Sequence, residues 1–211
     1  MKNSDKERIL SFFDELFPDA SCELIYHKDY ELLIAVMLSA QTTDQSVNKV
    51  TPILFSLFPT LEDLKNASIE ELENCIKTIG MFRQKAKHIK EIASRLLSDF
   101  NGVVPQDKEA LTSLSGVGIK TANVVRSELF NIPEIAVDTH VHRVSKRLYF
   151  AAIEDDVSDV ERKLRKILDK ERYIRTHHQM IHFGRYFCKA INPNCANCKL
   201  QDLCRYYRTK K

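Results

Sequence analysis

Residues 114–122 read Leu-Ser-Gly-Val-Gly-Ile-Lys-Thr-Ala, and this stretch decides the fold. Gly116 and Gly118 are two of only five glycines in the chain, and apolar helical patterns run on both sides of them. Glycine adopts positive φ and lets another backbone approach closely. The stretch therefore predicts a tight turn between two helices, with Val117 at an outward-pointing tip.

The residues after Gly118 predict a helix, because Ile119, Ala122, Val125 and Leu129 form one apolar face. The N-terminus of such a helix offers free N–H groups and partial positive charge, which suits a phosphate. Lys120 falls in the first turn, where the dipole penalises an ammonium, and a lysine whose charged form is disfavoured is a better nucleophile. An ordinary helix–helix turn with a solvated lysine has the same pattern, so the rest of the chain must decide.

Bulk composition is that of a globular protein with one large domain or two small ones. The 211 residues are 44% hydrophobic and 29% charged, and the net charge of +3 permits nucleic acid as a partner. The charged N-terminus precedes no apolar secretory core, and the longest apolar run, residues 32–38, is too short to span a bilayer. We therefore expect a cytoplasmic protein without a membrane segment.

Helical periodicity recurs along the chain, and no stretch alternates with period two for long enough to predict a strand. The sequence therefore predicts an all-α protein. Capping boxes at residues 4–7, 68–71 and 158–161 mark three helix starts, and Asp138 is a good N-cap for a fourth helix that runs to Phe150. The expected helices lie before Phe17 and at 30–40, 47–57, 61–67, 69–80, 84–100, 107–114, 119–130, 138–150, 158–168 and 173–188.

Four of the six cysteines crowd into the last 24 residues, with the spacing C-x6-C-x2-C-x5-C; they are Cys188, Cys195, Cys198 and Cys204. In a cytoplasmic chain such a cluster indicates a metal site more often than disulfides. Four thiolates suit zinc or a [4Fe–4S] cluster. Spacing alone does not choose between them, although the short C-x2-C knuckle favours zinc. The isolated Cys22 and Cys75 are expected to be small core residues.

Four features together resemble the endonuclease III family, the helix-hairpin-helix DNA glycosylases that also cut at abasic sites. They are Leu-Ser-Ala-Gln at residues 38–41, the stretch 114–122, Val-Asp-Thr-His at 137–140 and the cysteine spacing. The resemblance runs from Leu32 to Cys204 and implies a two-lobed, all-α fold. One lobe is a six-helix barrel at 22–132 that carries the helix-hairpin-helix at about 107–130. The other, 1–21 with 133–211, holds a [4Fe–4S] cluster in the loop 188–204, so the resemblance moves the expected ligand from zinc to iron–sulfur.

The resemblance also implies roles for individual residues. Lys120 and Asp138 would be catalytic, His140 would be structural, Ser39 and Asp44 would line the base pocket, and DNA would be contacted by Gln41, Met81, Gly116, Val117, Gly118 and Lys189. Gln41 and Met81 would fill the gap left by a flipped nucleotide; an ordinary exposed loop position is the alternative for Met81.

Three positions depart from the family pattern. Ser115 stands where the family usually has proline, and Met81 where it often has leucine. The loop 189–194 carries only one basic residue, Lys189, so we expect most phosphate contacts from the hairpin side and from Lys and Arg elsewhere, with Lys199 and Arg205 as neighbours of Lys189. A merely solvated Lys189 is the alternative.

The implied function is base-excision repair by a monomer associated with the nucleoid. The enzyme would remove oxidised or ring-saturated pyrimidines from duplex DNA and cut 3′ of the abasic site by β-elimination. A pyrimidine-dimer glycosylase of the same fold is one alternative. A non-catalytic binder of DNA structures is another, and the presence of both Lys120 and Asp138 argues against it. An adenine glycosylase is disfavoured, because Ala35 stands where those enzymes have a catalytic glutamate.

Overall fold

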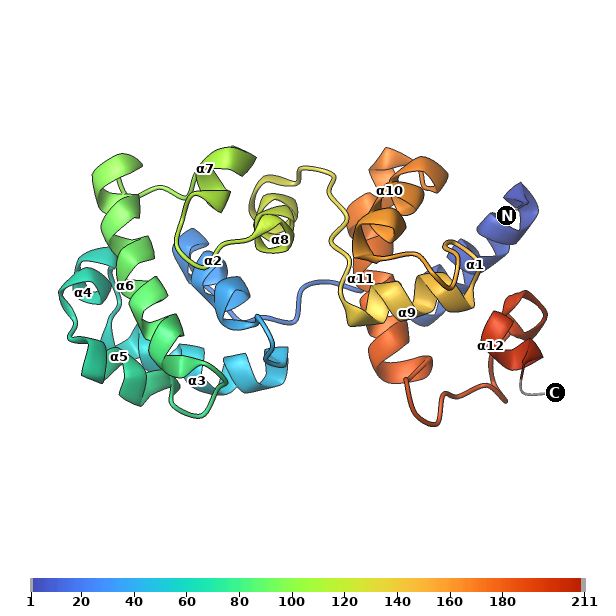
Figure 1. Ribbon diagram of the computed structural model, residues 1–211, viewed down its shortest axis with the longest axis horizontal. Helices are drawn as coiled ribbons and strands as arrows, with labels where there is room; N and C mark the ends of the chain where they lie inside the picture. Colours follow the sequence, from blue (N-terminus) through green and yellow to red (C-terminus); the bar gives the residue numbers. More distant parts are fainter. Residues whose placement is uncertain (1, 210–211) are drawn as a thin grey trace. The chain divides into compact units, whose positions relative to one another are not determined.

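The computed structural model describes residues 2–209, which fold into helices and loops without a strand (Figure 1). The expectation of an all-α protein is thus confirmed. Contacts divide the chain into two compact units. Glu23–Ile132 forms what we call the central unit, and Met1–Cys22 with Pro133–Lys211 forms the terminal unit. No helix in the described part is long and apolar enough to cross a membrane.

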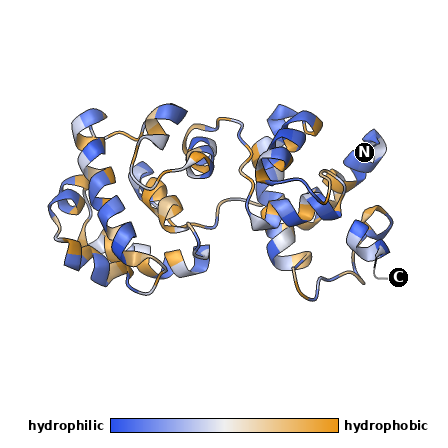
Figure 2. Ribbon diagram, viewed as in Figure 1, coloured by the Kyte–Doolittle hydropathy of each residue, from blue (hydrophilic) through white to orange (hydrophobic). Residues whose placement is uncertain are grey.

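The central unit is built around one buried helix, α2. Every side chain from 32 to 38 is buried, and Figure 2 shows α2 as predominantly hydrophobic. A helix that is apolar on all sides must be covered on all sides, and α3, α6 and α8 pack against α2. The helices of this unit are α2 (Asp29–Leu38), α3 (Asp44–Leu57), α4 (Leu61–Asn66), α5 (Ile69–Ile76), α6 (Phe82–Asp99), α7 (Lys108–Thr112) and α8 (Ile119–Phe130).

The terminal unit joins the first helix to the last third of the chain. Phe13 of α1 packs against Phe183, with ring centroids 5.0 Å apart, and both belong to one core with residues of α9 and α10. Its elements are α1 (Asn3–Leu16), α9 (Thr139–Arg147), α10 (Val157–Ile167), the 3-10 helix η1 (Lys170–Arg172), α11 (Tyr173–His182), the π-helical turn η2 (Phe183–Phe187), the 3-10 helix η3 (Gln201–Leu203) and α12 (Arg205–Arg208).

Two of the three expected capping boxes are wrong. The box at Ser68 is confirmed, since its side chain accepts from the N–H of Glu71. Ser4 lies inside α1, which begins at Asn3. Ser158 lies inside α10, because Asp156 comes two residues earlier and already caps that helix by accepting from Asp159 N at 2.8 Å.

Two other sequence expectations need smaller corrections. The helix after Asp138 ends at Arg147, before Tyr149 adopts a left-handed φ of 62°. Cys22 and Cys75 are half-buried and do not belong to the fully buried core.

Candidate active site and cysteine pocket

The glycine turn joins α7 to α8 in the central unit. Gly116 has φ +74°, the left-handed conformation expected of it, and the N–H of Val117 bonds the carbonyl of Leu114 at 3.1 Å. Gly118 is extended, with φ −88°. The expectation of an outward Val117 is wrong, because its side chain packs inward and is only 5% exposed. Any contact of Val117 with a ligand must therefore use its backbone.

His88 of α6 contacts this turn. Its Nδ1 lies 2.6 Å from the hydroxyl of Ser115, so the serine that replaces the family's proline gains a tether to another helix. A Cβ on Gly116 would lie 2.8 Å from Cδ2 of His88. The close approach and the positive φ both require glycine at 116.

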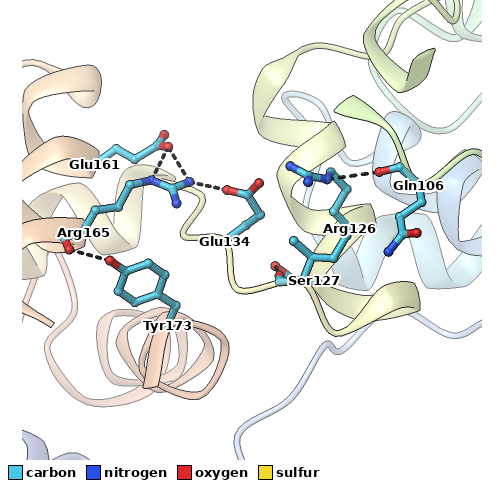
Figure 3. Close-up of polar contacts among 8 residues, drawn as sticks. Gln106, Arg126, Ser127, Glu134, Glu161, Arg165 and Tyr173 are labelled. Carbon is cyan, nitrogen blue, oxygen red and sulfur yellow. Dashed lines mark hydrogen bonds and ion pairs between the residues drawn. The ribbon is translucent and has the colours of Figure 1, made fainter. Parts of the chain in front are cut away.

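The N-terminus of α8 is open. Gly118 is its N-cap and no side chain caps the helix. The N–H groups of Ile119, Lys120 and Thr121 therefore have no partner within the helix, and together with the dipole they form an anion site. Lys120 is exposed at the second position of α8. Nε of Arg126 donates to the carbonyl of Gln106 (3.2 Å), which ties α8 to the segment before α7 (Figure 3).

Asp138 lies in the terminal unit and caps α9, as the sequence predicts. Its Oδ1 accepts from the N–H of Val141 at 2.7 Å. The segment that leads to it is firmly held, because Ile135, Ala136 and Val137 are all buried. The carboxylate is half-buried, so it remains partly accessible while it caps the helix.

A buried ion pair anchors the start of the same segment. Glu134, 6% exposed, pairs with Arg165 of α10, which also bonds Glu161 at 2.8 Å, and the Tyr173 hydroxyl donates to the Arg165 carbonyl (Figure 3). Burial alone would lower the pKa of Arg165, but the two carboxylates outweigh it and raise the pKa. The sequence did not predict this ion pair. Its one indication in the sequence is a glutamate beside an apolar run.

His140 is held in a packed environment on α9. Burial lowers its pKa, and Arg143 Nη2 lies 3.3 Å from its Nδ1. A Cβ on Gly184 would lie 2.8 Å from Cβ of His140, so η2 and α9 are in close contact. A neutral, packed imidazole agrees with the structural role expected for it.

Gln41 and Met81 lie on neighbouring turns of the central unit. Both adopt left-handed φ, 54° and 56°, and both are exposed, Met81 to 53%. A Cβ on Gly80 would lie 4.0 Å from the Gln41 carbonyl oxygen, which shows that the two turns adjoin. Ser39 donates its hydroxyl to the Val36 carbonyl at 2.8 Å.

Two further residues complete this neighbourhood. Asp44, half-buried, is the first residue of α3, where its charge also suits the helix dipole. Lys85 of α6 is buried against the turn that contains Gln41, and sequence reasoning missed it because a lone lysine in an amphipathic helix usually faces solvent.

The four clustered cysteines line one pocket, together with apolar side chains that include Leu148, Phe187 and Tyr206. Burial raises the pKa of Cys198 to about 11, and the other three thiols add to the effect. Among residues 2–209, no three His, Cys, Asp or Glu side chains converge closely enough to hold a single metal ion. The four thiols thus lie around one shared pocket.

Arg147 of α9 holds the loop after the first of these cysteines. Its Nη1 donates to Cys188 Sγ at 3.1 Å and to the Lys189 carbonyl at 2.8 Å, and its guanidinium lies 4.0 Å from the centre of the Tyr206 ring. The Lys189 side chain is exposed. Arg147 was not predicted, because its partners lie about forty residues away.

The expected assistants of Lys189 are engaged elsewhere in the terminal unit. Lys199 pairs with Glu15 of α1, with Nζ 2.7 Å from Oε2. Arg205 stacks on Tyr149, 4.4 Å from the ring centre. Both side chains thus have partners within the terminal unit, and their contact with phosphates stays a prediction.

The sequence matches known proteins along nearly its whole length. Residues 34–170 match the model of the HhH-GPD superfamily of base excision DNA repair proteins. The chain belongs to this family. It is 48% identical to endonuclease III of Bacillus subtilis, over 94% of this chain and 91% of that protein. It is 43% identical to endonuclease III of Escherichia coli K12, over 98% of this chain and 97% of that one.

Its fold is similar to that of a trapped covalent intermediate of endonuclease III with DNA, an estranged-adenine complex. The TM-score is 0.94 at 49% identity, and the match covers 100% of this chain and 99% of the other. The resemblance to the endonuclease III family is thereby confirmed.

Proposed function

We propose that this protein is a base-excision repair DNA glycosylase and abasic-site lyase that removes oxidised or ring-saturated pyrimidines from duplex DNA. The observation that carries the proposal is the hairpin, because Gly116 shapes a turn that leaves the N-terminus of α8 uncapped beside exposed Lys120. Near full-length similarity to endonuclease III, including a covalent complex with DNA, supports both activities. The protein acts as a monomer on the nucleoid in the cytoplasm.

The protein binds phosphates of the DNA before it contacts the bases. The free N–H groups of α8 and the backbone from Gly116 to Gly118 bind a phosphate on the damaged strand. A base inside the duplex is unreachable, so the nucleotide is turned out into a pocket. Gln41 then bonds the widowed base, Met81 wedges into the stack, and Ser39 and Asp44 line the pocket.

Chemistry begins at Lys120. Its neutral Nζ attacks C1′ of the sugar, the bond from C1′ to the base breaks, and the base leaves with a proton. The sugar ring opens to an iminium, loss of the C2′ proton follows, and the C3′–O bond breaks by β-elimination. Water then hydrolyses the imine and restores Lys120. Asp138 serves as the catalytic carboxylate, which takes a proton or stabilises cationic character on the sugar.

The cysteine pocket is proposed to hold a [4Fe–4S] cluster on Cys188, Cys195, Cys198 and Cys204. Four thiolates suit either zinc or such a cluster, and the likeness to endonuclease III supports the cluster. When bound, such a cluster carries one electron and cross-links the loop 188–204. The thiols must lose their protons first, and the donor Arg147 offsets part of that cost at Cys188. The exposed Lys189 then contacts a phosphate.

An activity assay tests the proposed function directly. Duplexes that contain thymine glycol, a pyrimidine dimer or an abasic site are incubated with the protein, and borohydride is added to trap an imine. We expect cleavage and a cross-linked band on thymine-glycol and abasic duplexes. Lys120→Ala should abolish the band, and Lys108→Ala, on the other side of the hairpin, should retain it. A band of equal strength with Lys120→Ala would refute the nucleophile.

Metal analysis tests the cluster. Protein purified without oxygen should be brown and contain four irons and four acid-labile sulfides per chain. Stoichiometric zinc without sulfide, in cells supplied with iron, would refute the proposal.

A further inference from the structure

Lys85 is a buried cation with uncharged partners. Its residue is 3% exposed, and its Nζ donates to the Leu38 carbonyl (2.8 Å), the Ala40 carbonyl (2.9 Å) and the Thr42 hydroxyl (2.8 Å). An ammonium has three N–H donors, so each finds one acceptor. Burial lowers its pKa, because the ammonium has lost water on entering the protein.

Its three acceptors form the end of α2 and the turn that follows. The last carbonyls of a helix carry partial negative charge and attract a cation, so Lys85 acts as a C-terminal cap supplied by another helix. Gln41 lies between the second and third acceptor, with φ +54° and an exposed side chain. A residue other than glycine is strained in this conformation, and Lys85 holds the chain on both sides of it.

The same residue also holds the second turn. Its backbone N–H bonds the Met81 carbonyl at 3.0 Å, and Met81 is the left-handed N-cap of α6. Gly80 adjoins the Gln41 carbonyl oxygen. One lysine therefore contacts the turn of Gln41 through its side chain and the turn of Met81 through its backbone.

Packing alone does not explain a lysine here. A methionine of similar length would fill the space without the cost of dehydrating an ammonium. What the methionine would lack is three directional bonds to one turn.

We infer that Lys85 is a positioning residue, which fixes the turns of Gln41 and Met81 so that both side chains enter the gap opposite a flipped nucleotide together. This inference rests on the proposed function. It assigns to Lys85 no contact with DNA and no step in bond breaking.

The test compares Lys85→Met with Lys90→Met. Lys90 lies on the same helix and also donates to a backbone carbonyl, that of Ala67 at 2.6 Å, at the end of α4. The probe is a duplex with a stable abasic-site analogue opposite 2-aminopurine, whose fluorescence reports insertion beside the widowed base. An undamaged duplex of the same sequence measures phosphate binding alone.

We expect Lys85→Met to bind the undamaged duplex within twofold of the parent, to bind the abasic duplex about tenfold more weakly and to lose most of the fluorescence change at saturation. Lys90→Met should behave as the parent in both assays. Equal behaviour of the two variants would overturn the inference. If Lys85→Met does not fold, Thr42→Val removes one acceptor and should give the same selective loss to a smaller degree; parental selectivity there would also overturn the inference.

A double-mutant cycle shows whether Lys85 acts through Gln41. If it does, Gln41→Ala in the Lys85→Met background should add less than about a twofold loss, because coupled residues are not additive. If the affinity losses of the two single variants multiply in the double variant, a positioning role is refuted. If the parent itself fails to prefer the abasic duplex, the proposed function fails; if the parent prefers it and Lys85→Met does too, only this inference fails.

Discussion

The two hairpin glycines should respond differently to alanine. Gly116 has φ +74°, and an added Cβ would lie 2.8 and 2.9 Å from ring carbons of His88 and 3.2 Å from Cγ of Met37. Left-handed strain costs roughly 1–2 kcal/mol and overpacking about 1–3 kcal/mol. Against this, alanine lowers the conformational entropy of the unfolded chain, which stabilises the folded protein by about 0.4–1 kcal/mol. These contributions sum to about 1–4.6 kcal/mol, and in the middle of that range Gly116→Ala should destabilise the protein by about 2–4 kcal/mol.

Gly118 is the matched control. Its φ of −88° suits alanine, and an added Cβ would meet no atom within 4 Å. Gly118→Ala should leave stability unchanged or raise it by about 0.4–1 kcal/mol. If a phosphate approaches this backbone, however, the methyl group will obstruct it, and affinity for any duplex should fall about tenfold, the equivalent of roughly 1.4 kcal/mol.

Thermal denaturation and duplex binding separate the two effects. A domain of this size loses roughly 2–4 °C of Tm for each kcal/mol, so Gly116→Ala should melt about 4–16 °C below the parent. Gly118→Ala should melt at or above it. A Gly116→Ala protein as stable as the parent would refute the packing argument, and full affinity of Gly118→Ala would refute close approach of a phosphate to the turn.

Three further predictions concern the terminal unit. Asp138→Asn keeps a good N-cap, so it should retain stability to within about 1 kcal/mol and lose roughly 10²–10⁴ in single-turnover rate; a parental rate would leave only the capping role. Lys189→Ala should weaken binding to all duplexes alike and flatten the slope of log K against log salt by about 0.9, with iron content unchanged; an unchanged slope would mean that this side chain grips no phosphate. At Asp14, burial alone would raise the pKa, but bonds from Gln179 and Arg172 outweigh it and lower the pKa. The stability this carboxylate contributes is thus complete above its ordinary pKa, near 4, and is lost as pH falls through the lowered value. The Tm of Asp14→Asn should therefore fall less steeply than that of the parent as the pH is lowered below 4. Equal slopes of Tm against pH in this range would contradict this.

Local features of the fold were predictable from the sequence, because neighbouring residues cause them. The glycine turn, the uncapped start of α8 and the N-cap at Asp138 each depend on a few consecutive residues. Capping boxes were less certain guides: Asp156 and Ser158 are both good N-caps, and only the packing of α10 selects between them.

Features that depend on distant residues were not predictable in this way. Val117 is buried in the tertiary structure although it lies at the tip of a turn. Lys85, Glu134 and Arg147 are charged residues whose partners lie 31 to 47 positions away. A charged residue usually indicates solvent, and only the tertiary structure shows which of them are buried and hydrogen-bonded.

The two units become complete at different times during synthesis of the chain. The central unit is contiguous, so all its residues are available once α8 has left the ribosome. The terminal unit is split, and Phe12 and Phe13 of α1 pack against Phe183 and Phe187, about 170 residues later. At ~5–20 residues per second, the apolar face of α1 waits roughly 10–30 s for its partners. During that interval a nascent chain that carries a folded central unit still exposes α1, which is where a holding chaperone would bind.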